Sequence, residues 1–369
     1  MHTRRHFLRQ ASAASAAAAL PLALPEFAFA APQRSFEPGS QRWRTFDVTT
    51  QVELALPPGA AQVWVPVPSI DTDWQKSLST RFSSNGQAAI AWDGAQGVQM
   101  VHARFEPGTA KAMLEVTSRV STRDRAVDWN VRGQVADDAA THAAWTQPTA
   151  LIPTDGLVRT AALHATRGAE GDVAKLHAIY DWIASNVYRE PSVRGCGEGD
   201  VNAMLKLGSP SGKCADINAL FVGMCRSVGI PARDLYGVRL APSAFGYKEL
   251  GGNSAQLAAA QHCRAEAYVK GHGWVAMDPA DVTKVMRQET AVWIRDVSDP
   301  VVAPVNKKLF GCCEGNWMAY NDAHDVVLPG ASGKPMGFLM YPVAETSAGR
   351  VDPYAPEQFR YSISAREVA

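Results

Sequence analysis

The chain has 369 residues, of which 46% are hydrophobic and 20% are charged. This length and composition are typical of a globular protein with two domains. The 36 basic and 36 acidic residues balance, which gives no reason to expect nucleic acid or an anionic membrane surface as a partner.

The first 30 residues have the pattern of an export signal. The adjacent Arg4 and Arg5 precede an Ala-rich stretch over residues 11–24, and a small-x-small cleavage sequence ends at Ala30. The paired arginines resemble a twin-arginine signal, which implies a periplasmic or secreted bacterial protein. An ordinary secretory signal that contains two arginines is the alternative. Cleavage removes three arginines and one glutamate, and leaves a net charge of about −2.

No permanent membrane anchor is expected. The apolar part of the signal is short and is broken by Pro21 and Pro25. A transmembrane helix needs about 18 to 20 consecutive apolar residues, and no later window of the sequence offers them. The sequence therefore predicts no stable membrane insertion of the mature chain.

Residues 31–150 are predicted to form an N-terminal β-sandwich-like domain. Hydrophobic and polar residues alternate with period two in short segments, and the first two segments are separated by the turn sequence Pro57-Pro58-Gly59. The strand candidates are 44–54, 61–67, 89–92, 98–105 and 111–120. Short strands at hairpin spacing favour two packed sheets. No group of catalytic side chains stands out here.

Residues 151–300 mix helix and strand patterns, which makes the whole chain α+β. One helix is predicted over 172–187 with Asp172 as its N-cap, and another begins near Cys214 and ends before Gly229 and Pro231. Strand candidates follow at 233–240 and on either side of the turn Lys270-Gly-His-Gly273. A Gly/Ser/Ala-rich insertion over 241–260 is either a substrate lid or a passive surface loop.

Residues 301–369 are predicted to be a C-terminal extension. The segment is rich in loops and ends in two strand candidates, 338–343 and 359–365. We expect these strands to pack on the core of the preceding domain.

The mature chain keeps six cysteines: Cys196, Cys214, Cys225, Cys263, Cys312 and Cys313. An oxidising compartment permits disulfides, but six cysteines allow 15 full pairings and the sequence does not choose among them. A ring between the adjacent Cys312 and Cys313 would be strained. No matching His or Cys spacing suggests a zinc site, and no acidic loop suggests calcium, so no cofactor is expected.

Cys214 is predicted to open a helix in the sequence Ser211-Gly-Lys-Cys-Ala-Asp-Ile-Asn. A helix N-terminus has unpaired N–H groups and partial positive charge, which favour thiolate over thiol and can bind an oxyanion. The alternative is a buried structural cysteine or half of a disulfide. That alternative suits Cys225, on the same helix, better than Cys214.

His262 and Asp278 are predicted to lie side by side on adjacent strands of a hairpin. We expect an Nδ1–H hydrogen bond from the imidazole to the carboxylate, which leaves Nε2 to face the thiol. His272 at the turn and Asp281 after Pro279 are the less favoured alternatives. Glu266 is expected to form an ion pair with Arg264 or Arg233.

These segments resemble the transglutaminase-like superfamily. The matching pieces are Gly212-Lys-Cys214-Ala-Asp-Ile-Asn, Gly229-Ile-Pro-Ala-Arg233, His262-x-x-x-Glu266-x-Tyr268 and Gly273-Trp274-x-x-x-Asp278-Pro279. The likeness covers about residues 172–285. It implies a papain-like core in which Cys214 is the nucleophile, His262 the base and Asp278 the orienting acid. An upstream aromatic group, Trp182 or Tyr188, is a candidate for the oxyanion site.

Two departures from the family pattern occur near the predicted base. Many members have His-x-Trp where this chain has His262-Cys-Arg264, and the turn before Trp274 is one residue longer. Neither departure touches the three predicted catalytic residues. Both bear on the shape of the substrate groove.

The sequence thus predicts an exported Cys-His-Asp enzyme that acts on peptide or side-chain amides through a thioester, with hydrolysis as the preferred outcome. The alternatives are an amine-dependent cross-linking transglutaminase and a non-catalytic binding module of the cell envelope. The expected partner is a peptide or protein substrate, including envelope components. Substrate identity and oligomeric state stay open.

Overall fold

The computed structural model describes residues 34–39, 42–56, 59–94, 96–131, 135 and 138–368. The predicted export signal and its cleavage site, and the prolines of the Pro57-Pro58 turn, lie outside the described residues. In this part of the chain, no helix is both long enough and apolar enough to cross a membrane.

The first sheet of the N-terminal region has the strand order β17-β1-β6-β3 and is antiparallel. Its strands are β1 (Arg44–Ala55), β3 (Gln75–Ser84), β6 (Lys111–Thr122) and β17 (Arg360–Val368). The alternation of apolar residues in β1 fixes which face is buried, because neighbouring side chains of a strand point to opposite faces. Strand β17 comes from the C-terminal end of the chain and pairs with β1 from Thr45↔Val368 to Glu53↔Arg360.

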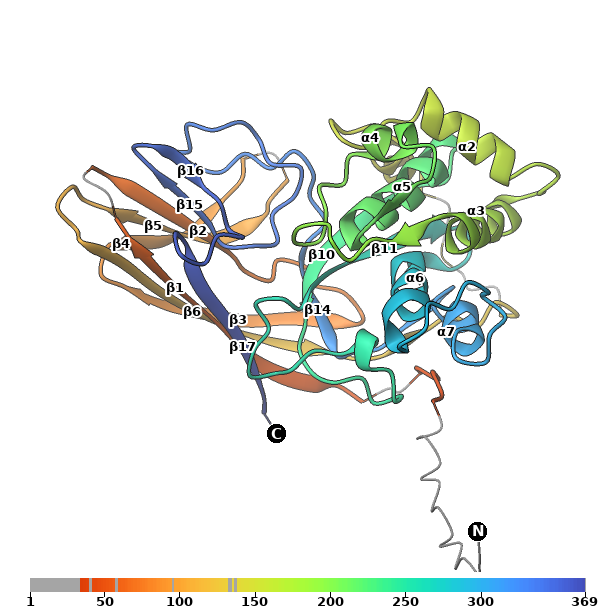
Figure 1. Ribbon diagram of the computed structural model, residues 1–369, viewed down its shortest axis with the longest axis horizontal. Coiled ribbons are helices and arrows are strands. Elements are labelled where there is room, and N and C mark those ends of the chain that lie inside the picture. The colour runs from red at the N-terminus through yellow and green to blue at the C-terminus, as the bar shows by residue number, and fades with distance from the viewer. Residues whose placement is uncertain are drawn as a thin grey trace, which may run out of the picture. The chain divides into compact units, whose positions relative to one another are not determined.

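The second sheet has the order β16-β15-β2-β5-β4. Its strands are β2 (Ala61–Pro66), β4 (Gln87–Trp92), β5 (Gln99–Phe105), β15 (Val343–Thr346) and β16 (Gly349–Val351). Apolar side chains from both sheets form one buried cluster that includes Val52, Val63, Phe105 and Leu114. The predicted β-sandwich is confirmed, and strands from the C-terminal segment complete both of its sheets (Figure 1).

A third antiparallel sheet, with the order β12-β11-β10-β14, lies in the helical region. Its strands are β10 (Ala232–Arg239), β11 (Gln261–Val269), β12 (Gly273–Met277) and β14 (Trp317–Asn321). Two short ladders join distant segments: β7 (Arg125–Ala126) with β13 (Cys312–Cys313), and β8 (Tyr188–Arg189) with β9 (Ser211–Gly212). The β8–β9 ladder is parallel.

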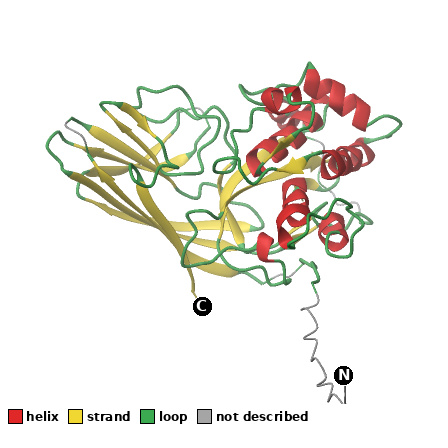
Figure 2. Ribbon diagram, in the orientation of Figure 1, coloured by secondary structure: helices red, strands yellow, loops and turns green. Residues whose placement is uncertain are grey.

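The helices gather around this third sheet and away from the sandwich strands (Figure 2). They are α1 (Ala139–Trp145), α2 (Leu157–Ala165), α3 (Asp172–Asn186), α4 (Val201–Lys206), α5 (Cys214–Ser227), α6 (Pro279–Lys284) and α7 (Ala303–Lys308), with a 3₁₀ turn η1 (Lys248–Leu250) and a π turn η2 (Val285–Glu289). The fold class is therefore α+β, as predicted.

Helix α5 is the centre of the helical region. Every residue of it except Asp216 is buried, and it packs on β10 and β11 with α2, α3, α4 and α6 around it. The helix ends at Ser227, where Gly229 takes a positive φ of 85° and the Ile230 N–H donates to the carbonyl of Cys225. A central helix that is enclosed in this way holds its first residue in a fixed position.

Three expectations for single elements need correction. Gly171, not Asp172, is the N-cap of α3. The strand expected over 338–343 is found at β15, Val343–Thr346, where it pairs with β2. Strand β3 was not predicted at all, because most of its side chains are solvent-exposed and show no apolar alternation. The domain limits at residues 150 and 300 stay predictions.

Candidate active site

Cys214 is the first residue of α5, and its side chain is buried. The segment before it is held by the carboxylate of Asp216. One oxygen accepts the N–H of Lys213 at 2.9 Å, and the other accepts the N–H groups of Glu198 and Gly199, both at 2.9 Å. The side chain of Asp216 thus ties the 195–200 loop to the start of the helix and fixes the backbone around Cys214.

Two glycines make room for this carboxylate. A Cβ atom at Gly197 would lie 1.8 Å from Oδ2 of Asp216, and one at Gly212 would lie 2.5 Å from its Cβ. Gly197 also has a positive φ of 90°, which side chains disfavour. Glycine at both positions is therefore a steric requirement of the turn that precedes the cysteine.

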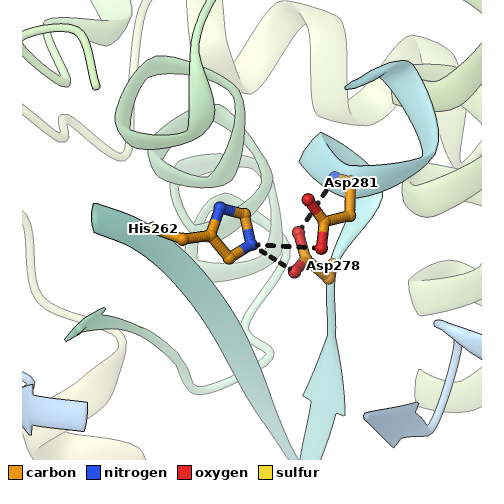
Figure 3. Close-up of side chains that lie close together, drawn as sticks. All are labelled: His262, Asp278 and Asp281. Atoms are coloured by element: carbon orange, nitrogen blue, oxygen red, sulfur yellow. Dashed lines mark hydrogen bonds and ion pairs between the residues drawn. The ribbon is translucent and has the colours of Figure 1, made fainter. Parts of the chain in front are cut away.

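His262, near the start of β11, and Asp278, directly after β12, are in contact. Nε2 of His262 lies 2.7 Å from Oδ2 of Asp278, and both side chains are buried (Figure 3). The β11–β12 register pairs Ala265 with Met277, so Asp278 comes opposite Arg264 and reaches His262 diagonally along the same face. The predicted contact is confirmed, although the two residues are not directly opposite.

The orientation of the imidazole differs from the prediction. Nε2, the ring nitrogen farther from the backbone, faces the carboxylates. Nδ1 is therefore the nitrogen that remains for Cys214. The physical reason is the diagonal offset, because the carboxylate of Asp278 lies beyond the outer end of the ring.

Asp281 also belongs to the site, contrary to the expectation that it falls outside. Its Oδ2 lies 3.4 Å from Nε2 of His262, and its Oδ1 accepts from Arg239 at 2.6 Å. Asp278 is the N-cap of α6 and accepts the N–H of Asp281 at 3.1 Å. The first turn of α6 therefore brings the second carboxylate back to the imidazole (Figure 3). Asn218 of α5 donates at 3.3 Å to Oδ1 of Asp278, the same oxygen that accepts the N–H of Asp281.

The electrostatics of this network favour a thiolate and an imidazolium. Burial by itself would raise the pKa of Cys214, but hydrogen bonds with Cys196, Cys263 and His262 bring that pKa well below its usual value. Burial would lower the pKa of His262, and so does Arg239, but Asp281 and Asp278 raise it above its usual value. The two shifts act in the same sense, since each favours transfer of the thiol proton to the ring.

Two further thiols, those of Cys196 and Cys263, help to lower the pKa of Cys214, and sequence reasoning missed both. Cys196 donates to the carbonyl of Gln261 at 3.2 Å, and its pKa is raised, first of all by Cys214. Its neighbour Cys214 is the one at the helix N-terminus and next to the imidazole, so Cys214 is the thiol that ionises. All six cysteines are free and buried.

A cavity of about 600 Å³ opens beside Cys214 and His262. The 251–260 part of the Gly/Ser/Ala-rich insertion lines one side of it, and aromatic side chains of the C-terminal segment line another, namely Tyr341, Tyr354, Phe359 and Tyr361. The insertion predicted as a lid or a passive loop is thus part of the cavity wall. The C-terminal segment contributes a wall that was not foreseen.

Neither aromatic candidate for the oxyanion site lines this cavity. Tyr188 stacks edge-on against Trp293 with ring centroids 5.6 Å apart, and Trp182 packs partly buried against the core. The alternative histidine, His272, lies against Trp129 with ring centroids 5.2 Å apart, and it does not line the cavity either.

His262, Asp278 and Asp281 also have ligand atoms within 4.8 Å of one another, close enough for a metal ion. The guanidinium groups of two arginines already occupy this neighbourhood. Arg239 lies 2.6 Å from Asp281, and Nε of Arg264 lies 3.7 Å from Asp278. Two fixed positive charges oppose a divalent cation, so the cluster is better described as a buried ion-pair network.

A second buried network lies farther along β11. Glu266 contacts Arg125 and pairs with Arg233 at 2.7 Å, and Arg233 also pairs with Asp322 at 2.7 Å. The expected pairing with Arg233 is confirmed, while the alternative with Arg264 is wrong. The guanidinium of Arg264 instead lies over the ring of Trp317.

Comparison with known proteins places the chain in a family. The sequence profile of the transglutaminase-like superfamily matches residues 159–279, which include Cys214, His262 and Asp278. An uncharacterized protein of Haemophilus influenzae is 31% identical over 345 residues, which cover 88% of this chain and 91% of that protein. This chain belongs to the transglutaminase-like superfamily.

One solved structure has a similar fold. The crystal structure of a candidate cysteine protease from Cytophaga hutchinsonii matches with a TM-score of 0.50 and 16% identity, and the match covers 88% of this chain and 98% of that one. The periplasmic domain of TgpA from Pseudomonas aeruginosa is less similar, with a TM-score of 0.31 and 15% identity over 75% of this chain and 98% of that one. The predicted transglutaminase-like core behind a β-sandwich is confirmed.

Proposed function

We propose that this chain is an exported cysteine enzyme that hydrolyses peptide or side-chain amides, with Cys214 as nucleophile, His262 as base and Asp278 as orienting carboxylate. One observation carries the proposal. The buried thiol of Cys214 and the imidazole of His262 line the same cavity, the imidazole helps to hold the pKa of the thiol below its usual value, and Nε2 of the ring lies 2.7 Å from a buried carboxylate. Thiol, imidazole and carboxylate in this order are the groups that acyl transfer requires.

The reaction follows from the positions of these groups. The Cys214 thiolate attacks the amide carbon, and its sulfur forms a bond to that carbon while the carbonyl oxygen gains charge. The N–H of Cys214, at the start of α5, has no backbone acceptor among the described residues and is a donor for this oxyanion. The imidazolium of His262 then gives its proton to the departing amine, and a thioester remains.

Hydrolysis of the thioester completes the cycle. His262, now neutral, takes a proton from water, and the hydroxide oxygen attacks the thioester carbon. The carbon–sulfur bond breaks, the acid leaves, and Cys214 and His262 return to the ion pair. Asp278 holds the ring and stabilises its charged form throughout. A primary amine in place of water would give the transglutaminase reaction.

The test compares the wild-type protein with Cys214→Ala on cell-envelope extracts, with and without an added primary amine. Release of free acid by the wild type supports the hydrolase, and incorporation of the amine supports the cross-linking transglutaminase. Cys225→Ala, a change on the same helix but away from the cavity, is the control and should keep activity. Activity in Cys214→Ala equal to that of the wild type would refute the assignment.

A location outside the cytoplasm is part of the proposal, and it rests on the paired arginines and the small-x-small sequence of residues 1–30. The test fuses residues 1–35 to a reporter that only the folded-protein export route can move. Export of the reporter supports the twin-arginine assignment. Retention of the reporter, or export in cells that lack this route, contradicts it.

A further inference from the structure

The cavity beside Cys214 has an unusual charge. The basic residues Arg189, Lys213, Arg239, Lys284 and Arg360 line it, and no aspartate or glutamate is among its described lining residues. A cavity with cations and no acidic group attracts anions. The question is which of these cations are available to a ligand.

Three of the five have a carboxylate nearby. Arg239 pairs with Asp281 at 2.6 Å, and Lys284 pairs with Glu249 at 3.2 Å. Arg360 is exposed and lies opposite Glu53 in the β1–β17 register. The charges of Arg239 and Lys284 are met by these carboxylates, and Arg360 is exposed to solvent.

Arg189 and Lys213 are different. In the described part of the chain neither forms an ion pair, and the polar contact of Arg189 is a hydrogen bond from Nε to Gln288 at 3.0 Å. The acidic groups nearest to Lys213 in sequence are engaged with other donors. Asp216 accepts three backbone N–H groups, and Glu190 accepts the N–H and hydroxyl of Ser192.

Arg189 and Lys213 both line the cavity beside Cys214. Strands β8 and β9 form a two-residue parallel ladder in which Arg189 pairs with Gly212, directly before Lys213. Both side chains are half-buried. Burial lowers the pKa of Lys213, the positive charge of Arg189 lowers it further, and Cys196, Cys214 and Asp216 offset part of this shift. Two like charges held side by side are unfavourable, and a bound anion would relieve this repulsion.

We propose that Arg189 and Lys213 form an anion subsite that binds a carboxylate of the acyl donor. The proposal rests on the function proposed above, because Lys213 precedes Cys214 and the bound carboxylate would lie close to the amide under attack. A carboxylate is the anion that a peptide carries, either on an acidic side chain or at its C-terminus. A guanidinium and an ammonium provide the hydrogen-bond donors that a carboxylate needs.

The alternative is that these cations only stabilise the Cys214 thiolate. A pair of matched alkylating reagents separates the two roles. Iodoacetate and iodoacetamide react in the same way: the thiolate sulfur forms a bond to the CH₂ carbon, and iodide leaves. They differ in one group, because iodoacetate carries a carboxylate and iodoacetamide carries a neutral amide. Loss of thiolate slows both reagents equally, whereas loss of an anion subsite slows iodoacetate alone.

The experiment measures the rate of Cys214 alkylation by each reagent, mapped by mass spectrometry, in the wild type and in Lys213→Gln and Arg189→Gln. We expect each variant to lower the iodoacetate-to-iodoacetamide rate ratio by about fivefold, the size of one partly exposed ion pair. Arg189→Lys and Lys213→Arg keep the charge and should keep most of the ratio. Lys206→Gln, an exposed lysine on α4 outside the cavity, should leave it unchanged.

A non-reacting pair of probes gives a second measurement. Glutarate should protect Cys214 of the wild type from iodoacetamide, glutaramide should not, and Lys213→Gln should lose the protection. Equal ratios in all variants, or equal protection by both probes, would overturn the subsite while Cys214 remains reactive. Slow and unselective alkylation of Cys214 by both reagents would instead count against the proposed function itself.

Discussion

The sandwich and the helical region differ in how far their ion pairs are exposed to solvent. In the sandwich, each described ion pair has at least one solvent-exposed partner: Lys111 and Glu53 are 50% and 44% exposed, and the buried Asp47 pairs with Arg119, which is 43% exposed. Around the third sheet, charged groups are buried, and Arg239 and Asp281 are each 2% exposed. Exposed pairs contribute little to stability, whereas buried charges depend on their partners. The buried charges therefore mark the part of the fold that is organised around chemistry.

The largest effect on stability is expected from Glu266→Gln. This change leaves Arg125 and Arg233 buried without their shared carboxylate, and loss of one partner of a buried pair costs about 3–5 kcal/mol. Urea denaturation of both proteins measures the difference. A loss of stability no greater than that of an exposed pair would break the comparison between the two regions.

The contribution of Glu266 to stability should depend on pH. Burial opposes the charged form of Glu266, but Arg233 and Arg125 hold its pKa below the usual value. Its contribution is therefore present at neutral pH and is lost as the pH falls through the folded-state pKa. Glu266→Gln should flatten the acid side of the stability curve.

The next expected effect is on the imidazole. In a Cys214→Ala background, Asp281→Asn should lower the pKa of His262, because one of the two carboxylates that raise it is removed. The imidazolium is then lost at a lower pH. Titration of the ring by NMR measures this shift. An unchanged ring pKa would show that Asp278 alone sets the charge of His262.

A smaller effect is expected from Cys196→Ala. The Cys196 thiol helps to lower the pKa of Cys214, so its removal should raise that pKa. The midpoint of the pH dependence of Cys214 alkylation would then move to higher pH. Cys225→Ala should leave the midpoint in place, since Cys225 is not among the groups that set the pKa of Cys214.

The smallest effect is expected from Lys111→Gln in the sandwich. Its partner Glu53 is half-exposed, so water replaces the lost interaction and the stability should barely change. The same urea denaturation used for Glu266→Gln measures it. A large loss here would mean that the sandwich depends on its surface charges after all.

Hydrophobic periodicity in the sequence correctly predicted helices and strands where that periodicity is strong. Alternation in β1 and β6 and the apolar positions of α3 and α5 located those elements within a few residues. Helices α4, α6 and α7 have six residues each, too few for a helical period to show. Short elements are therefore found only when the surrounding chain is in place.

The residues of the candidate site also fall into two groups, those that the sequence predicted and those that it did not. Cys214 at a helix start and the His262–Asp278 hairpin are local features, and both could be predicted. Asp281 reaches the imidazole only through the first turn of α6. Cys196 meets Cys214 through a loop whose carbonyl accepts the Ala215 N–H. Contacts made by irregular segments have no period in the sequence, so they could not be predicted.

Strand β17 has a consequence for synthesis on the ribosome. It follows every other described strand in the chain, and it covers the edge of β1 that is not paired with β6. A nascent chain that stalls before Arg360 therefore carries an open sheet edge, and unpaired edges recruit other chains. Residues 360–368 must therefore be synthesised before both edges of β1 can be paired.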